Sequence, residues 1–363
     1  MKVAVLIDTW SPVVGGGQIN AWEISKRIAK KGVEIDIVTR NCGQDRLQKI
    51  KNLRIYKLGP KTTTFDSLSK ILFIFKSYFF ISKRDYNLVH AHAFLPGITA
   101  RLLMVFKGIS AIFTVHGTSI NTGLNNYFSK WLEKFILTEV NYSAQITVSR
   151  DFLKIKNVNN KIYYVPNGVD VSVFDKIKVK KFGQPTLIFV GRLHPQKNLE
   201  TLISAMNIVK SLIPDIKLLI VGEGELKAKL QKRVKDLKLE QNVKFLGHRM
   251  GKDLILLNKS SHLFILPSIY EGQPLTLLEA WASKLPVIVS KTGDCPYLVN
   301  NKNGYIVEQA NDANSLAKTI LKAVKNKNLA RMGQEGYNLV KNNYSWEIAA
   351  DLTLKLYGKT INL

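Results

Sequence analysis

The chain has 363 residues, 46% of them hydrophobic, so it is long enough for two domains with buried cores, and its composition excludes an intrinsically disordered protein. The two cysteines, Cys42 and Cys295, exclude a disulfide framework, and neither belongs to a CxxC pair that would indicate a metal or redox site. The net charge of +26 makes anionic partners candidates, and the alternative is a compositional bias that leaves a solvated basic surface. No zinc finger, helix-turn-helix or RNA-binding aromatic motif accompanies the charge, so we expect no nucleic acid among the partners.

Along the first half, short apolar runs alternate with longer amphipathic ones, which is typical of a parallel sheet covered by helices. The expected strands are Val3–Ile7, Glu34–Thr39, Leu53–Lys57, Leu88–His90, Ala111–Val115, Gln145–Val148 and Ile162–Val165. The expected helices are Gln18–Lys31, Asp66–Ser82, Leu95–Phe106 and Asn126–Glu139. The first apolar run stops at Asp8 and is too short for a signal peptide, so we expect a cytoplasmic protein.

The second half repeats the scheme. Its expected strands are Thr186–Val190, Lys217–Val221, Val243–Leu246, Leu263–Leu266, Pro286–Val289 and Tyr305–Val307. Its expected helices are Leu199–Ser211, Leu226–Leu237, Leu275–Ser283, Ala313–Lys325, Leu329–Asn342 and Trp346–Tyr357.

The domain boundary is expected near Pro166-Asn167-Gly168, ahead of a polar, lysine-rich connection. This gives a first domain at residues 1–168, a second at 169–343 and a C-terminal helix at 344–363 that could cross back to the first domain. The predicted fold class is α/β, with two Rossmann-like, doubly wound domains facing an interdomain cleft. Ligands of such sheets bind at the carboxyl ends of the strands.

Two loops, each after the first strand of its half, could bind phosphate. In Gly15-Gly16-Gly17 the backbone can approach an anion closely, and the helix that follows presents its N-terminus. In Gly191-Arg192-Leu193, with Lys197 further on, a guanidinium fork and an ammonium group could embrace a diphosphate. The alternatives are a plain strand-to-helix turn and a solvated pair of basic side chains.

A third segment, from Glu271 to Glu279, carries two carboxylates on either side of a helix start. Glu271 precedes the helix and can face a ligand, whereas Glu279 lies in its second turn and could accept hydrogen bonds from a ribose diol. The backbone N–H groups of the turn between them could bind phosphate oxygens. The residues of that turn are Gly272, Gln273, Pro274 and Leu275.

Together with Pro166-Asn167-Gly168-Val169-Asp170, these three segments resemble the GT4 family of retaining glycosyltransferases, which have the GT-B fold. The order and spacing of the motifs match along nearly the whole chain. The resemblance implies that the first domain binds an acceptor and the second a nucleotide sugar. It implies that the reaction needs no cofactor and no catalytic metal.

The resemblance also implies residue roles. Arg192 and Lys197 would hold the leaving diphosphate, Glu271 would contact the hydroxyls of the donor sugar, and Glu279 would bind the ribose. From the other domain, Gly16 and Gly17 would close over the phosphates. The loop containing Arg249 would pack near the nucleobase.

Three histidines follow or end strands of the first half. His116 ends a strand in Thr114-Val115-His116-Gly117, and by resemblance it would reach the donor sugar or the acceptor. His90 and His92 form an HxH pair that would suit a metal, but no third ligand is evident. We expect one of them to line the cleft.

One motif departs from the family pattern. Members often have Glu-Gly-Phe-Gly where this chain has Glu271-Gly272-Gln273-Pro274. Pro274 carries no N–H group, so one potential phosphate donor is missing, although proline suits the first turn of a helix. This departure affects the expected position of the donor in the site, and it leaves the expected reaction class unchanged.

The function expected from these features is transfer of a hexose or related sugar from a UDP- or GDP-sugar to a glycan or lipid-linked acceptor, in polysaccharide or glycolipid synthesis. Retention is implied by the family, and same-face substitution is the hypothesis because no residue identifies itself as a nucleophile. The alternatives are a sugar-nucleotide epimerase of the GT-B type and a non-catalytic nucleotide-sugar-binding protein. A Rossmann oxidoreductase is disfavoured by the missing GxGxxG.

Two segments of the first domain mix aromatic residues with lysines, 68–84 and 127–135. Such segments can bind an anionic membrane peripherally, here at the inner face of the cell membrane. The alternative is that both are ordinary helices packed on the sheet, with their lysines extended into solvent.

Overall fold

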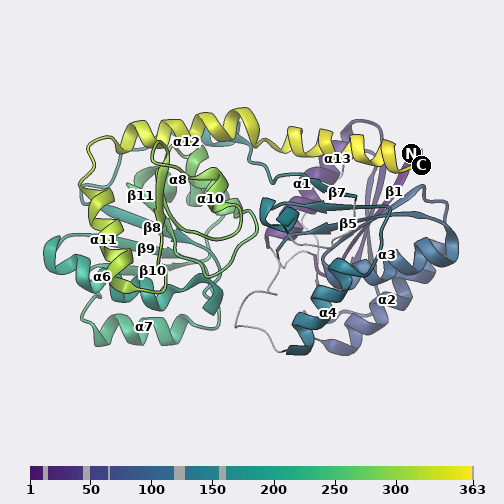
Figure 1. Cartoon of the computed structure of the whole chain (residues 1–363), viewed down its shortest axis with the longest axis horizontal. Coiled ribbons are helices and arrows are strands. Elements are labelled where there is room, and N and C mark those ends of the chain that lie inside the picture. The colour runs from purple at the N-terminus through teal and green to yellow at the C-terminus, as the bar shows by residue number, and fades with distance from the viewer. Residues whose placement is uncertain (11–14, 44–49, 64–65, 118–126, 155–160, 362–363) are drawn as a thin grey trace. The chain divides into compact units, whose positions relative to one another are not determined.

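The computed structural model describes residues 1–10, 15–43, 50–63, 66–117, 127–154 and 161–361, which form two compact units (Figure 1). The N-terminal unit runs to Gly168 and also includes residues 346–363, whereas the C-terminal unit spans Val169–Ser345. Each unit is built on one parallel sheet.

The N-terminal unit has a seven-stranded sheet in the order β3-β2-β1-β4-β5-β6-β7. Its strands are β1 (Lys2–Ile7), β2 (Glu34–Arg40), β3 (Leu53–Leu58), β4 (Leu88–His92), β5 (Ser110–Val115), β6 (Ala144–Thr147) and β7 (Ile162–Tyr164). Its helices are α1 (Gly16–Lys30), α2 (Ser67–Ser82), α3 (Phe94–Lys107), α4 (Tyr127–Thr138), the 3-10 helix η1 (Arg150–Lys154) and α13 (Trp346–Ile361). Asn126, the expected start of α4, lies outside the described residues.

Helices cover both faces of this sheet. The order places the crossovers from β3 to β4, β4 to β5 and β5 to β6 on one face, so α2, α3 and α4 lie together there, while α1 and α13 pack against each other on the opposite face (Figure 1). Central strands such as β1 therefore consist of continuous apolar runs, because both of their faces are buried.

The C-terminal unit has a six-stranded sheet in the order β10-β9-β8-β11-β12-β13. Its strands are β8 (Thr186–Val190), β9 (Lys217–Val221), β10 (Val243–Gly247), β11 (Leu263–Leu266), β12 (Val287–Ser290) and β13 (Gly304–Val307). Its helices are α5 (Val171–Asp175), the 3-10 helix η2 (Pro195–Lys197), α6 (Leu199–Leu212), α7 (Lys227–Asp236), α8 (Gly251–Ser260), α9 (Leu275–Ala282), α10 (Cys295–Leu298), α11 (Ala313–Val324) and α12 (Leu329–Asn343).

The sequence pattern did not predict α5, α8 or α10. Helix α8 begins at a glycine and buries only one large apolar side chain, Ile255, so its periodicity is weak. Its existence follows from topology, since β10 and β11 are parallel and need a crossover between them. Pro286, predicted as the start of a strand, lies just before β12, because proline has no N–H group to give to a neighbouring strand.

No helix in the described part of the chain combines the length and the apolar composition that crossing a bilayer requires.

Candidate functional site

In the N-terminal unit, His116 and the glycine turn lie together at the carboxyl edge of the sheet. His116 directly follows β5, and a Cβ atom on Gly17 would be only 3.2 Å from its Cδ2 atom. The missing side chain at Gly17 therefore lets the imidazole approach the first turn of α1, where Gly16 is exposed. The first N–H groups of a helix have no partner within it, so this turn is suited to an anion.

His116 belongs to a hydrogen-bonded group of histidines. Its Nε2 atom lies 2.9 Å from Nδ1 of His92, and their rings stack at 5.2 Å between centroids. His90 is held differently, with Nδ1 at 2.7 Å from the Tyr357 hydroxyl of α13 and Nε2 at 2.6 Å from Oγ1 of Thr114. His90 thus anchors α13 to the sheet, and His92 is the member of the HxH pair that contacts His116.

Burial keeps these imidazoles neutral near pH 7. It lowers the pKa of His90 to about 3 and that of His116 to about 4, and it lowers the pKa of His92 well below its usual value. Among the described residues, no three His, Cys, Asp or Glu side chains are placed to hold a metal ion.

In the C-terminal unit, the loop after β8 is shaped by its contact with the loop after β9. Leu193 donates its N–H to the Glu223 carbonyl at 2.9 Å. Gly222 has φ +140°, and a Cβ atom there would lie 1.9 Å from the carbonyl oxygen of Gly191. Only glycine allows this approach, and η2 then returns the chain so that Lys197 lies beside Gly191.

The loops after β8 and β11 are joined by Gln196. Its carbonyl accepts the N–H of Ile269 at 2.8 Å, and its Nε2 atom donates to the Tyr270 carbonyl at 2.9 Å. These bonds place the next residues together, so that Nζ of Lys197 lies 2.5 Å from Oε1 of Glu271, with both side chains largely buried. The structure therefore forms an ion pair from two residues that the sequence assigned to separate roles.

A third loop, after β12, supports Glu271 from behind. Gly293 has φ +55°, and a Cβ atom there would lie 2.4 Å from the carbonyl oxygens of both Glu271 and Gly272. Asp294 donates its N–H to the Gly272 carbonyl at 2.8 Å and accepts a 3.0 Å hydrogen bond from Nε2 of Gln273. The side chain of Gln273, which was expected to contact the ligand, is thus buried and holds the loop in place. Gln196, Gly293 and Asp294 were not predicted as site residues, although glycines that follow neighbouring strands could have indicated the loops that contain them.

Helix α9 begins directly beyond this turn. Pro274 is its N-cap, with extended backbone, and so lies just before the helix, as the expected helix start at Leu275 predicted. The helix starts at Leu275, which is partly exposed. Glu279, in the second turn, has a carboxylate for which no hydrogen-bond or ion-pair partner is found in the described part of the chain, and burial raises its pKa to about 7.

Two of the expected arginines are exposed. Arg192 lies in the loop after β8 and Arg249 follows β10, and neither guanidinium forms a hydrogen bond or ion pair within the described ranges. Strand β9 lies between β10, which Arg249 follows, and β8. The structure therefore does not place Arg249 beside the Lys197–Glu271 pair, whereas the loops after β11 and β12 do lie beside that pair.

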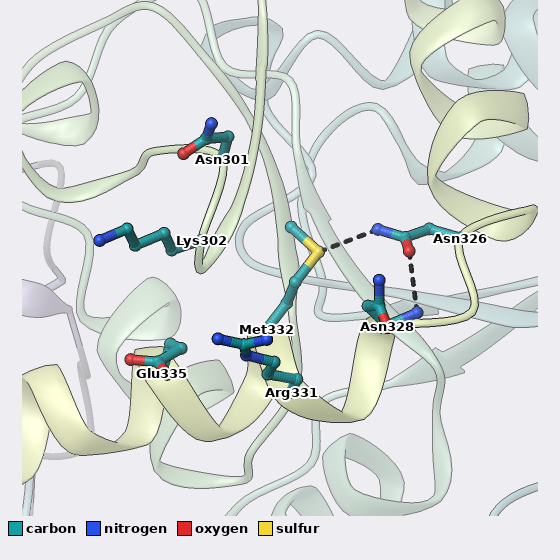
Figure 2. A pocket seen from close by; sticks show the side chains of 7 residues that line it. All are labelled: Asn301, Lys302, Asn326, Asn328, Arg331, Met332 and Glu335. Carbon is teal, nitrogen blue, oxygen red and sulfur yellow. Dashed lines mark hydrogen bonds between the residues drawn. The ribbon is translucent and has the colours of Figure 1, made fainter.

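A pocket of about 310 Å³ lies elsewhere in this unit. Figure 2 shows its lining side chains. It is lined by the segment before β13, the end of the α11–α12 connection and the first turns of α12, with the residues Asn301, Lys302, Asn326, Asn328, Arg331, Met332 and Glu335. Because the first of these residues precede β13, the pocket lies at the amino edge of the sheet, opposite the edge that carries Lys197 and Glu271.

Comparisons with known proteins identify the family of the chain. The family model described as Glycosyltransferase Family 4 matches residues 14–173, and the one described as Glycosyl transferases group 1 matches residues 172–339. The chain is 26% identical to the UDP-Gal:alpha-D-GlcNAc-diphosphoundecaprenol alpha-1,3-galactosyltransferase of Escherichia coli, over 98% of this chain and 97% of that protein.

A second relative is the GDP-mannose-dependent monoacylated alpha-(1-6)-phosphatidylinositol monomannoside mannosyltransferase of Corynebacterium glutamicum, 31% identical over 66% of this chain and 68% of that protein. Among solved structures, sucrose-phosphate synthase from Thermosynechococcus elongatus superimposes with a TM-score of 0.86 at 22% identity, covering 99% of this chain and 98% of that one. The fold is thus that of the GT-B glycosyltransferases.

Proposed function

The chain belongs to family 4 of the glycosyltransferases, and from this premise we propose that it transfers a hexose or related sugar from a UDP- or GDP-sugar to a glycan or lipid-linked acceptor, with retention of configuration. The donors named for the two relatives, UDP-galactose and GDP-mannose, support a nucleotide sugar, and their lipid-linked acceptors support the acceptor class.

The observation that carries this proposal is the Lys197–Glu271 pair at the carboxyl edge of the C-terminal sheet. Glycosyl transfer needs positive groups that stabilise the departing nucleoside diphosphate, and carboxylates that hold hydroxyl groups. Lys197, Arg192 and the N-terminus of α9 would hold the diphosphate. Glu271 would accept hydrogen bonds from the sugar, and Glu279 from the ribose.

In the reaction we propose, the bond between the anomeric carbon and the donor phosphate oxygen breaks as the acceptor oxygen bonds to the same face of that carbon. The acceptor proton passes to the departing phosphate, which leaves as the nucleoside diphosphate. In the N-terminal unit, neutral His116 and the start of α1 would orient sugar and phosphate. Because cations of the chain stabilise the leaving group, we propose that neither a metal nor another cofactor is needed.

The test is a thermal-shift and hydrolysis screen against UDP-, GDP-, ADP- and dTDP-sugars. We expect one nucleotide class to stabilise the protein, and slow hydrolysis of its sugar to fall by about 100-fold or more in Arg192→Ala and Glu271→Ala. Arg331→Ala, an exposed arginine at the amino edge, is the matched control and should retain activity. Equal loss in all three variants, or no shift with any nucleotide sugar, would contradict the proposed site.

The same preparation separates the alternatives. An epimerase would convert the donor to an epimer without an acceptor, and a binding protein would be stabilised by the donor without hydrolysing it. Activity that survives a chelator would support the metal-free reaction, and activity abolished by it would contradict it.

A further inference from the structure

The outward face of α2 is apolar, contrary to the usual pattern of a surface helix. Its inward face is formed by Phe73, Ser77 and Ile81, which are buried, and Oγ of Ser77 lies 3.1 Å from Oγ1 of Thr99 on α3. The opposite face carries five side chains that are 40–66% exposed: Leu68, Ile71, Leu72, Phe75 and Phe79. An exposed apolar face of this kind, bordered by charged residues, marks a surface that contacts a protein or a membrane.

These five residues, which we call the α2 stripe, form one continuous row. Their spacing follows the three- and four-residue repeat of a helix, so the stripe runs for about 16 Å along α2 at 1.5 Å per residue. Helix α3, which packs against α2, also carries exposed apolar side chains, since Val105 and Phe106 are 55% and 67% exposed. Helix α4 lies on the same face of the sheet (Figure 1). Its Trp131 and Phe135 rings are stacked on each other and exposed.

The charge around the α2 stripe is predominantly positive, and the acidic residues at the ends of α2 are Asp66, which caps it, and exposed Asp85. Helices α2 and α3 contain no acidic residue, and their basic residues are Lys70, Lys76, Arg101 and Lys107. Exposed Lys83 and Arg84 follow α2 directly. A second copy of the chain docked stripe to stripe would bring these like charges together, whereas an anionic bilayer surface would complement them.

We propose that the α2 stripe docks this enzyme on an anionic membrane, with its apolar side chains inserted at the level of the lipid headgroups and the flanking lysines paired with lipid phosphates. This inference rests on the proposed function and extends it, because a lipid-linked acceptor would be found at a membrane. It concerns a surface formed within the N-terminal unit alone.

The test is cosedimentation of the full chain with vesicles of phosphatidylglycerol and phosphatidylcholine, compared with phosphatidylcholine alone. We expect binding to the anionic vesicles that weakens as salt is raised. Phe75→Gln/Phe79→Gln should reduce the partition coefficient by at least about tenfold, because two exposed aromatic side chains no longer enter the lipid. Lys76→Gln/Lys83→Gln should weaken binding to the anionic vesicles at low salt and flatten its dependence on salt, because fewer cations pair with lipid phosphates.

Matched controls lie on the C-terminal unit. Val179→Gln/Leu212→Gln replaces two similarly exposed apolar side chains, and Lys318→Gln/Lys327→Gln removes two exposed charges, so neither pair should alter binding. Failure of the native chain to bind at low salt would overturn the proposal, as would binding that Phe75→Gln/Phe79→Gln leaves unchanged. Self-association lost in that variant, without vesicle binding, would assign the stripe to a second copy and overturn it too.

Donor hydrolysis without vesicles, measured on the same samples, separates this proposal from the proposed function. Every substituted side chain is exposed and none belongs to the loops that carry Lys197 and Glu271, so hydrolysis should persist in all variants. Absence of donor hydrolysis in the native chain would contradict the glycosyltransferase site, whereas the result with vesicles would still stand.

Discussion

At the residue scale, burial sets the chemistry of the candidate site. Glu279 is partly covered in the second turn of α9, and its pKa rises to about 7 because the charged form loses solvent there. The imidazole of His116 is kept neutral in the same way. A partly protonated acid and a neutral histidine both favour hydrogen bonding with sugar hydroxyls over salt-bridge formation.

Glu279 should make nucleotide binding depend on pH. Ribose hydroxyls would donate to the ionised carboxylate, so binding of the proposed nucleoside diphosphate should strengthen by up to about tenfold per pH unit from about pH 6 towards pH 7 and level off above it. Isothermal titration over this range measures the slope. Glu279→Gln should bind more weakly and with a flatter profile, and a slope identical to that of the native chain would contradict the role of Glu279.

The same shift has the opposite sign for stability. Since the folded pKa of Glu279, about 7, lies above the ordinary value of 4.5, the folded chain retains a proton that the unfolded chain loses. This contribution is fully present below about pH 4.5 and is lost as the pH rises through about 7. Relative to Glu279→Gln, the native chain should therefore become less stable across that window, as measured by denaturant unfolding.

His92 should act as a positioning residue for His116. Replacement by Phe keeps a ring beside His116 but removes the 2.9 Å hydrogen bond, so we expect kcat to fall by about tenfold with little change in KM. His92→Asn can restore a hydrogen-bonding atom near the position of Nδ1 and should recover activity in part. Thr114→Val, which breaks a bond of His90 instead, is the control that should affect stability alone. Equal losses in His92→Phe and His92→Asn would contradict the positioning role.

At the element scale, the candidate donor site is a junction of loops that follow adjacent strands. Strands β8, β11 and β12 are neighbours in the sheet, and their loops are joined by hydrogen bonds of Gln196 and Asp294 and by the close approach of Gly293. The contacts are made by backbone groups and by side chains that are at least partly buried, so the position of Glu271 depends on the shape of all three loops.

Gly293→Ala should therefore disturb the site from behind. Alanine is strained at φ +55°, and its Cβ would press on the carbonyl oxygens of Glu271 and Gly272, so we expect a loss of about 3 kcal/mol in unfolding free energy and weaker nucleotide binding. Gly251→Ala is a matched control, since Gly251 has φ +54° and a Cβ atom there would have nothing within 4 Å. That variant should show about 1 kcal/mol of backbone strain alone. Equal effects of the two variants would mean that the loop contact contributes nothing.

At the scale of the whole molecule, the last helix belongs to the first unit. Helix α13 packs against α1, where Arg27 donates to Glu347 at 2.8 Å, and it reaches the sheet through the hydrogen bond between Tyr357 and His90. The N-terminal unit is thus completed by residues from the opposite end of the chain, and its stability depends on them.

Tyr357→Ala should destabilise the N-terminal unit by about 3 kcal/mol, because it leaves a cavity and removes the partner of a buried imidazole. Leu352→Ala, at an exposed position of the same helix, should cost less than about 0.5 kcal/mol. Denaturant unfolding followed by circular dichroism measures both. Similar costs for the two substitutions would contradict the packing of α13.

The sequence by itself determined the fold class and most of the elements. Strands covered on both faces must be apolar throughout, and this made runs such as Thr186–Val190 and Leu263–Leu266 recognisable to the residue. Glycine, arginine and glutamate in fixed order after particular strands identified the glycosyltransferase family, because their type and spacing match the motifs of that family. Short helices such as α8 were missed, since they carry too few buried side chains to show a period.

Only the tertiary structure decided which groups meet. The pairing of Lys197 with Glu271, the bonds of Gln196 and the approach of Gly293 depend on which strands are neighbours, and sequence distance does not encode this order. The sequence also left undetermined which face of α2 packs against the sheet, because a helix with apolar residues on two sides has no pattern that indicates which side faces the core. Packing against the sheet selected Phe73, Ser77 and Ile81, and thereby left the α2 stripe exposed.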